Sequence, residues 1–160
     1  MRAPANSAAA VEDPLALEQQ VCFALSVAAR NVVAVYRPLL EPMGLTHPQY
    51  LVMLALWQHE PVSVRQLSRL LQLDPGTLSP LLKRLETSGL LVRRRDSKDE
   101  RALAVTLTDK GRLLRRDAEK IPPAVVARLG MDLEELRALH LSLTRVIKVA
   151  QQASNIDGAP

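Results

Sequence analysis

Apolar residues recur at helical spacing at both ends of the chain, over residues 14–40 and 132–153. Side chains three and four positions apart lie on one face of an α-helix, so the pattern predicts two long amphipathic helices. In the first segment the apolar positions are Val21, Ala24, Leu25, Ala28, Val32, Val35, Tyr36 and Leu39. In the second they are Leu133, Leu136, Leu139, Leu143, Val146, Ile147 and Ala150. Shorter elements are expected between these two helices.

Start and stop signals predict the shorter helices. Asp74 followed by Pro75 is typical of a helix N-terminus, and Gly89 is typical of the residue that follows a helix. Two further helix starts are indicated by capping boxes, which are formed by Thr46 with Gln49 and by Ser63 with Gln66. A helix is therefore expected from about residue 47 to 59, and a pair of helices should fill residues 64–88.

Two strand-like runs follow, at residues 90–94 and 102–107, and the second alternates apolar and polar side chains. The charged loop RRDSKDER joins them. A further helix should begin at Thr108, and the Pro122-Pro123 pair should break or kink it. Two short helices followed by a β-hairpin form a winged helix-turn-helix, so the expected fold is mainly α-helical with a small β-hairpin wing.

Positive charge is concentrated in this predicted unit, residues 61–108. Residues 61–101 hold nine Lys or Arg and five Asp or Glu, a net charge of +4 that equals that of the whole chain. Such a unit suits double-stranded DNA, with the first turns of its second helix in the major groove. The candidate contacts there are Pro75, Gly76, Thr77, Ser79, Pro80, Lys83 and Arg84. Lys83 and Arg84 are expected at phosphates, and the two hydroxyls at bases or phosphates.

Length and cysteine content indicate the domain organisation and the cellular compartment. We expect one folded part, residues 14–154, between disordered tails at residues 1–13 and 155–160. The single cysteine, Cys22, excludes an intramolecular disulfide and is consistent with the cytoplasm. No signal peptide or membrane span is expected, because acidic residues precede the apolar residues 21–29 and no apolar run approaches about 20 residues.

The outer helices, residues 14–40 and 109–153, present more apolar surface than one small winged domain can cover. Packing them against the same helices of a second subunit would bury that surface, so we expect a homodimer. A dimer also supplies two recognition helices for half-sites about one DNA turn apart. The alternative is a monomer with a larger helical core.

The order of these elements resembles the MarR family of bacterial transcriptional regulators over residues 15–152. Asp99-Glu100-Arg101 followed by Leu107-Thr108 is similar to that family's wing signature, an Asp-x-Arg before a Leu-Thr helix start. The resemblance implies that Arg101 enters the minor groove and is oriented by Asp99. Arg95 is a further candidate contact, and the alternative for each basic residue is a solvated surface charge.

A narrower resemblance is to the organic-hydroperoxide-resistance regulators (OhrR), repressors that leave DNA when an N-terminal cysteine is oxidised. It is carried by QVCFAL at residues 20–25, YRPLL at 36–40, PQYL at 48–51 and LDPGTLSPLLKR at 73–84. It implies that Cys22 is a sensing thiolate whose sulfenic acid is capped by a small thiol, as in one-cysteine members. From the residues alone, Cys22 would be a small buried hydrophobe, as lone cysteines usually are.

In those regulators, tyrosines of the partner subunit hydrogen-bond the cysteine, and Tyr36 matches one of them. His47 stands where the family usually has a second tyrosine, and Ser26 where another is common. His47 could still donate a hydrogen bond, or the pocket could have lost its peroxide response, or His47 could face water. Tyr50 also matches the family and is expected in the core or the pocket wall, and Trp57 is expected in the core.

Three functions compete. The leading one is a redox-responsive homodimeric repressor with organic hydroperoxide or a small thiol at Cys22. The second is a regulator released by a reversible phenolic or aromatic effector, with Cys22 structural. The third is a thiol peroxidase, which lacks a resolving cysteine here, so we expect no enzyme, no catalytic residues and no cofactor. No metal site is expected either, because His59 and His140 lack ligand partners at metal-like spacing.

Overall fold

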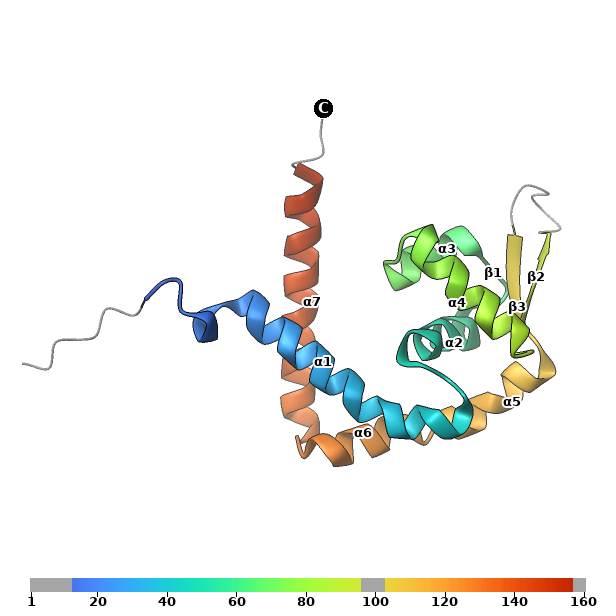
Figure 1. Cartoon of the computed structure of the whole chain (residues 1–160), viewed down its shortest axis with the longest axis horizontal. Coiled ribbons are helices and arrows are strands. Elements are labelled where there is room, and N and C mark those ends of the chain that lie inside the picture. The colour runs from blue at the N-terminus through green and yellow to red at the C-terminus, as the bar shows by residue number, and fades with distance from the viewer. Residues whose placement is uncertain (1–12, 96–102, 157–160) are drawn as a thin grey trace, which may run out of the picture. The chain divides into compact units, whose positions relative to one another are not determined.

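The computed structural model describes residues 13–95 and 103–156, and the chain divides into two compact units, Met1–Ala34 and Val35–Pro160 (Figure 1). In chain order the elements are η1 (Leu17–Gln19), α1 (Val21–Leu40), η2 (Glu41–Met43), α2 (His47–His59), β1 (Val62–Ser63), α3 (Val64–Leu71), α4 (Pro75–Thr87), β2 (Leu91–Arg95), β3 (Leu103–Leu107), α5 (Asp109–Ala118), α6 (Ile121–Leu129) and α7 (Leu133–Ile156). Helices dominate, and one small antiparallel sheet accompanies them, which confirms the predicted fold class.

The sheet belongs to the winged unit and has the strand order β1-β3-β2, antiparallel throughout. β2 and β3 form the predicted hairpin, in register from Leu91 opposite Leu107 to Arg95 opposite Leu103. β1 was not predicted, because two residues are too short to carry an alternating pattern. The core beneath the sheet is made of fully buried side chains from α3, α4 and the hairpin, namely Leu67, Leu78, Leu82, Leu85, Leu91 and Val105.

The predicted caps of the winged unit are confirmed. Ser63 Oγ accepts a hydrogen bond from the Gln66 amide at 3.1 Å, and Gln66 Oε1 accepts one from the Ser63 amide at 2.9 Å. Gly89 follows α4 with φ of +72°, a left-handed conformation that glycine adopts at little cost. The outer helices differ from the prediction at their ends, since α1 begins at Val21 after a short 3₁₀ turn and α7 continues to Ile156.

Prolines define one further boundary. Pro122 and Pro123 fall in the first turn of α6, where a missing amide hydrogen costs nothing, so they separate α5 from α6. Pro80 lies inside α4 and Pro38 inside α1, each within an otherwise continuous helix. The break between α5 and α6 was predicted, while the start of a new helix at the prolines themselves was not.

Both outer helices expose apolar side chains. The exposed fraction is 68% at Val21 of α1 and 69% at Leu141 of α7. Contrary to the expectation from sequence, Val21–Met43 is long and apolar enough to span a membrane by length and composition. Arg30 and Arg37 lie within this segment, however, and charged side chains are costly in hydrocarbon. Burial against another protein surface accounts for the exposed apolar side chains without that cost.

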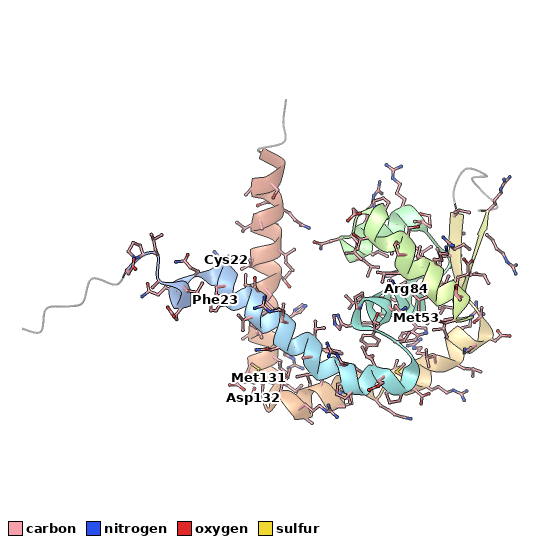
Figure 2. All side chains as sticks on the ribbon, in the orientation of Figure 1. Cys22, Phe23, Met53, Arg84, Met131 and Asp132 are labelled. Atoms are coloured by element: carbon pink, nitrogen blue, oxygen red, sulfur yellow. The ribbon has the colours of Figure 1, made fainter. Side chains whose placement is uncertain are left out.

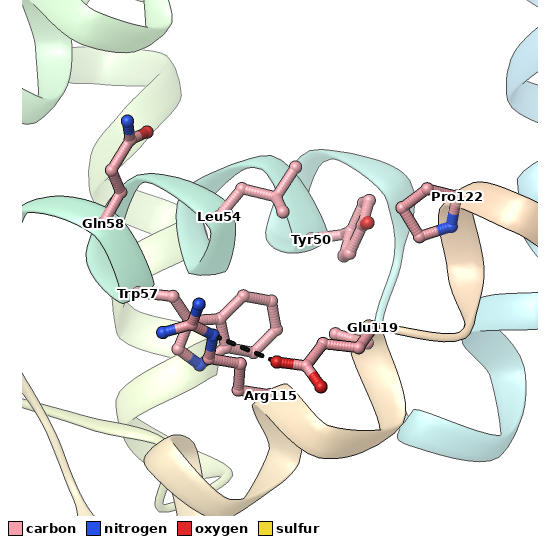
Figure 3. A pocket seen from close by; sticks show the side chains of 8 residues that line it. Tyr50, Leu54, Trp57, Gln58, Arg115, Glu119 and Pro122 are labelled. Carbon is pink, nitrogen blue, oxygen red and sulfur yellow. Dashed lines mark ion pairs between the residues drawn. The ribbon is translucent and has the colours of Figure 1, made fainter. Parts of the chain in front are cut away.

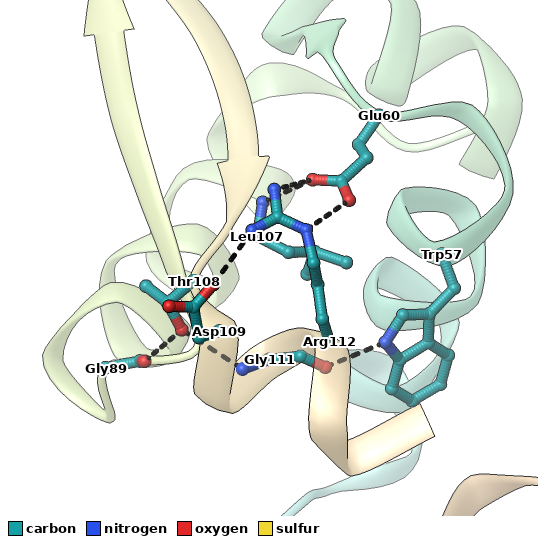
Figure 4. Close-up of polar contacts among 8 residues, drawn as sticks. All are labelled: Trp57, Glu60, Gly89, Leu107, Thr108, Asp109, Gly111 and Arg112. Carbon is teal, nitrogen blue, oxygen red and sulfur yellow. Dashed lines mark hydrogen bonds and ion pairs between the residues drawn. The ribbon is translucent and has the colours of Figure 1, made fainter. Parts of the chain in front are cut away.

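A hydrogen-bonded junction joins α4, the hairpin and α5 (Figure 4). Thr108 Oγ1 accepts from the Gly111 amide at 3.0 Å and donates to the Gly89 carbonyl at 2.6 Å. Gly111 has no space for a side chain, because a Cβ there would lie 2.0 Å from the carbonyl oxygen of Leu90. The Leu-Thr helix start predicted from sequence is therefore the point where α5 is fixed against the end of α4.

Glu60, just after α2, holds the other side of this junction. Its carboxylate accepts from the Leu107 amide at 2.8 Å and from Arg112 Nε at 2.9 Å and Nη2 at 3.1 Å. The hydrogen bond to Glu60 raises the pKa of Arg112 above its ordinary value, so the guanidinium stays charged. The end of α2 is thereby tied to both β3 and α5.

We expect Gly111→Ala to lower the free energy of unfolding by at least about 2 kcal/mol, because the backbone of Leu90 must shift to admit a methyl group. Gly44→Ala is a matched control, since Gly44 has positive φ but open space around it and should cost only about 1 kcal/mol. Urea titrations followed by circular dichroism compare the two. Equal losses would mean that α5 moves away from Leu90 freely.

Candidate DNA interface and sensing site

The first turns of α4 present the predicted DNA contacts to solvent. Leu78, Leu82 and Leu85 of this helix are buried against the core. The remaining faces carry the exposed residues Pro75, Gly76, Thr77, Ser79, Pro80, Lys83 and Arg84, of which Figure 2 marks Arg84. The predicted contact residues thus share one accessible helix, and its buried leucines fix its orientation in the winged unit.

Asp74 fixes the start of α4 and engages one predicted contact. Its Oδ1 accepts from the Thr77 amide at 2.9 Å, and its Oδ2 accepts from the Thr77 hydroxyl at 2.7 Å. The hydrogen bond from the Thr77 side chain is the main cause that lowers the pKa of Asp74. Because the Thr77 hydroxyl proton is committed to Asp74, its oxygen is left to accept, which suits an amino group on a base edge.

Basic side chains of β2 divide into two kinds. Arg93 is committed to Glu86 of α4, with Nη2 and Oε2 only 2.6 Å apart, and this hydrogen bond lowers the pKa of Glu86. Arg94 and Arg95 are exposed at the end of the strand. Arg95 was predicted as a contact and stays a prediction, and sequence alone did not show that Arg93 is the arginine engaged by α4. The predicted wing contacts outside the described residues are Asp99 and Arg101.

Four side chains of the second unit form an aromatic cluster, which consists of Tyr36, His47, Tyr50 and Trp57. The His47 ring lies edge-on to Tyr36 with centroids 5.0 Å apart, Tyr50 lies 6.0 Å from Tyr36, and Trp57 lies 6.4 Å from Tyr50. The structure therefore brings together the three predicted pocket residues. His47 is half-buried against Tyr36, which contradicts the alternative that it simply faces water.

Burial favours the uncharged forms of His47 and Tyr50 in this cluster. Burial lowers the pKa of His47, because the imidazolium is harder to solvate than the neutral ring. Burial also raises the pKa of Tyr50, with a smaller contribution from the nearby Tyr36. Tyr50 is only 3% exposed, which confirms its expected place in the core or pocket wall. Neutral imidazole and phenol groups can donate hydrogen bonds without the desolvation cost of a charge.

Trp57 is half-buried rather than fully in the core, and it lines an open hollow of about 420 Å³ (Figure 3). Tyr50 and Leu54 lie on the α2 side of this hollow. On its other side, Arg115 of α5 forms an ion pair with Glu119, the residue after this helix, with 3.6 Å between Nε and Oε1. Sequence reasoning missed this hollow, because its walls come from α2, α5 and α6 and meet only in the fold.

Cys22 lies in the first unit, near the start of α1, and its side chain is exposed (Figure 2). The Ser26 hydroxyl donates to the Cys22 carbonyl at 2.8 Å, so Ser26 is engaged with its own helix. The thiol is exposed within this unit, and its role as a sensor stays a prediction. Within residues 13–95 and 103–156, no group of three His, Cys, Asp or Glu side chains could hold a metal ion.

A helix-turn-helix pair with an exposed second helix, followed by a β-hairpin, defines a winged-helix protein of the class that regulates transcription. A family model described as "Transcriptional regulator SarA/Rot" matches residues 34–117. The relatives below match over most of the chain. The chain belongs to the MarR family of transcriptional regulators.

The relatives include a regulator named for organic hydroperoxide resistance and a regulator whose structure was solved on DNA. The chain is 39% identical to the organic hydroperoxide resistance transcriptional regulator of Bacillus subtilis, over 88% of this chain and 95% of the relative. It is 49% identical to the HTH-type transcriptional regulator TtmR of Methylorubrum extorquens, over 80% of this chain and 66% of the relative. The structure of reduced AbfR bound to DNA, from Staphylococcus epidermidis, matches with 34% identity and a TM-score of 0.69, covering 84% of this chain and 94% of AbfR.

The buried His47 should make folding stability sensitive to acid. Its pKa is lowered from 6.5 in the folded state, so the unfolded chain binds the proton more readily. Stability is therefore complete above about pH 6.5 and falls as the pH drops towards the lowered pKa. Urea midpoints between pH 7.5 and 5 should show this loss in the wild type and less of it in His47→Gln. His140→Gln, at an exposed position, should behave like the wild type.

Proposed function

We propose that this protein is a homodimeric DNA-binding repressor that senses organic hydroperoxides by oxidation of Cys22 and then releases its operator. The observation that carries the proposal is the 39% identity, over nearly the full length, to a regulator of organic hydroperoxide resistance. The single cysteine is exposed near the start of α1, which suits a thiol that meets a soluble oxidant. It acts on DNA as a regulator rather than as an enzyme, and its place is the cytoplasm.

DNA binding is assigned to α4 and the wing. α4 enters the major groove, where Thr77 and Ser79 face base edges and Lys83 and Arg84 neutralise phosphates. The remaining helix contacts are Pro75, Gly76 and Pro80, which approach the bases closely. In the wing, Arg101 enters the minor groove with Asp99 beside it, and the exposed Arg95 contacts the backbone.

The redox step takes place at the sulfur of Cys22. Its thiolate attacks the distal oxygen of the hydroperoxide, and with one added proton the products are a sulfenic acid and an alcohol. The sulfur loses two electrons and the peroxide O–O bond gains them. A small cellular thiol then condenses with the sulfenic acid, forming a mixed disulfide and water. Tyr36 and His47 donate hydrogen bonds to the reacting sulfur, and Tyr50 forms the wall of this sensing pocket.

Dimerisation joins the two activities. The exposed apolar side chains of α1 and α7 pack against those of a second copy, so that two α4 helices are held at a fixed spacing. Oxidation of Cys22 changes the arrangement of this interface and hence that spacing. Operator binding and oxidation are therefore coupled through one two-state assembly.

The first test is oxidation of the operator complex. Reduced wild type is bound to DNA from its own upstream region, and fluorescence anisotropy is followed while an organic hydroperoxide is added. Release is expected near one equivalent per subunit, because each chain holds a single thiol. Cys22→Ser should bind with unchanged affinity and stay bound. Release of both proteins at the same dose would contradict sensing at Cys22.

The second candidate, a reversible phenolic or aromatic effector, gives a different outcome in the same assay. In that case both proteins bind DNA, neither responds to hydroperoxide, and both are released by an aromatic acid. Such a result would retain the DNA-binding role and remove the redox role from Cys22.

The phosphate contacts predict a salt dependence. Arg84→Ala should weaken operator and unrelated DNA by a similar factor and reduce the slope of log affinity against log salt by about 0.9, the value for one lost phosphate contact. Arg128→Ala is the control, because Arg128 is equally exposed but lies on α6. Identical slopes for the two variants would remove Arg84 from the interface.

A further inference from the structure

A continuous series of hydrogen bonds links the aromatic cluster to the end of α4 (Figure 4). The indole Nε1–H of Trp57 donates to the carbonyl oxygen of Gly111 at 2.9 Å. The Gly111 amide donates to Thr108 Oγ1 at 3.0 Å, and the Thr108 hydroxyl donates to the carbonyl of Gly89 at 2.6 Å. Gly89 follows the last turn of α4. Three hydrogen bonds therefore connect a side chain of α2 to the terminus of the recognition helix.

The backbones that this series of hydrogen bonds connects are closely packed. A Cβ at Gly111 would lie 2.0 Å from the Leu90 carbonyl oxygen, and the Thr108 amide donates to the same oxygen at 3.1 Å. Hydrogen bonds weaken steeply when they are stretched or bent. A displaced Trp57 must therefore either carry the first turn of α5 with it or lose its bond to Gly111. Because α5 is already in contact with the segment after α4, the displacement passes to that segment.

Trp57 is also part of the aromatic cluster that contains the predicted pocket residues. Its ring packs edge-on to Tyr50, which packs against Tyr36, and Tyr36 contacts His47. Trp57 also lines the hollow, together with Arg115 (Figure 3). The indole is half-buried, and it borders this open space. One residue thus takes part in both the aromatic packing and the junction with α5.

We propose that Trp57 is a positioning residue that transmits the state of the aromatic cluster to the recognition helix. The proposal rests on the proposed function, in which oxidation of Cys22 alters the pocket that Tyr36, His47 and Tyr50 form. In the reduced protein the cluster holds the indole so that it bonds Gly111. Rearrangement of the cluster shifts the indole, and the shift reaches the C-terminal end of α4 through Thr108.

The test compares operator affinities of the reduced and oxidised forms, whose ratio measures the coupling. Trp57→Phe keeps an aromatic ring but removes the indole N–H donor. We expect it to bind operator within about twofold of wild type when reduced, and its reduced-to-oxidised affinity ratio to fall at least about fivefold. Gln58→Ala is the matched control, since Gln58 is the next residue of α2 and lines the same hollow. A lowered thermal midpoint with an unchanged ratio would assign Trp57 a purely structural role and overturn the proposal.

A second measurement does not depend on that variant. Trp57 is the only tryptophan in the chain, so intrinsic emission reports its surroundings directly. One equivalent of hydroperoxide should shift the emission of wild type without DNA, and should leave Cys22→Ser unchanged. Thr108→Val removes the next hydroxyl, so its emission should still shift while its release from DNA weakens.

The outcomes separate the two proposals. If wild type releases DNA on oxidation but its emission does not change, or if Trp57→Phe releases with the same ratio, transmission through Trp57 is wrong and the sensor stands. If wild type binds DNA and does not respond to oxidation at all, the proposed function fails, and the role of Trp57 fails with it.

Discussion

The close approach of α5 to the backbone after α4 is the constraint on which the winged unit depends. At Gly111 the two backbones are so near that a methyl group would meet the Leu90 carbonyl at 2.0 Å. That proximity lets Thr108 cap α5 and bond Gly89 with one hydroxyl, and it places Arg112 within reach of Glu60. The hairpin, α2 and α4 are all anchored at this junction. Without it, α4 would keep its buried leucines but lose its fixed relation to α5.

On the predicted DNA-binding surface, ion pairs within the protein decide which basic side chains are available to DNA. Arg93 is committed to Glu86, and Arg112 to Glu60, so both act within the fold. Asp74 stays charged at the N-terminus of α4, where it stabilises the positive end of the helix dipole but also opposes a nearby phosphate. The exposed cations that remain, such as Lys83 and Arg84, lie further along the helix. This arrangement favours a defined docking position over strong attraction to any phosphate.

Sequence reasoning succeeded where the signal is local. The capping boxes, the Asp74-Pro75 helix start, the Gly89 stop and the hairpin each depend on residues a few positions apart, and the structure contains all of them. It failed where distant segments meet. β1 exists only because Val62 pairs with Val105 of β3, and the bond from Trp57 to Gly111 spans two elements far apart in sequence. The hollow beside Trp57 was missed for the same reason.

Part of the candidate site followed from the family resemblance and not from residue patterns. Spacing alone left Cys22 as a small hydrophobe, and its role as a sensor stays a prediction that the family resemblance supplied. His47 illustrates the opposite case, in which a departure from the family pattern left its role open. Its edge-on packing on Tyr36 and its lowered pKa show a neutral ring built into the aromatic cluster. A neutral imidazole can donate a hydrogen bond as a tyrosine hydroxyl does, although it adds an acid sensitivity that a phenol lacks.

The exposed apolar surfaces of α1 and α7 connect both sensing and DNA binding to the formation of a dimer. α7 has its apolar side chains exposed along its length, and α1 buries only Leu40. A helix in water gains most of its stability from packing, so these two depend on a second surface that covers them. If that surface is another copy of the chain, then any change that weakens the interface also loosens the helices that hold the two α4 elements apart. A small chemical change at one thiol can then alter operator binding without touching any residue that contacts DNA.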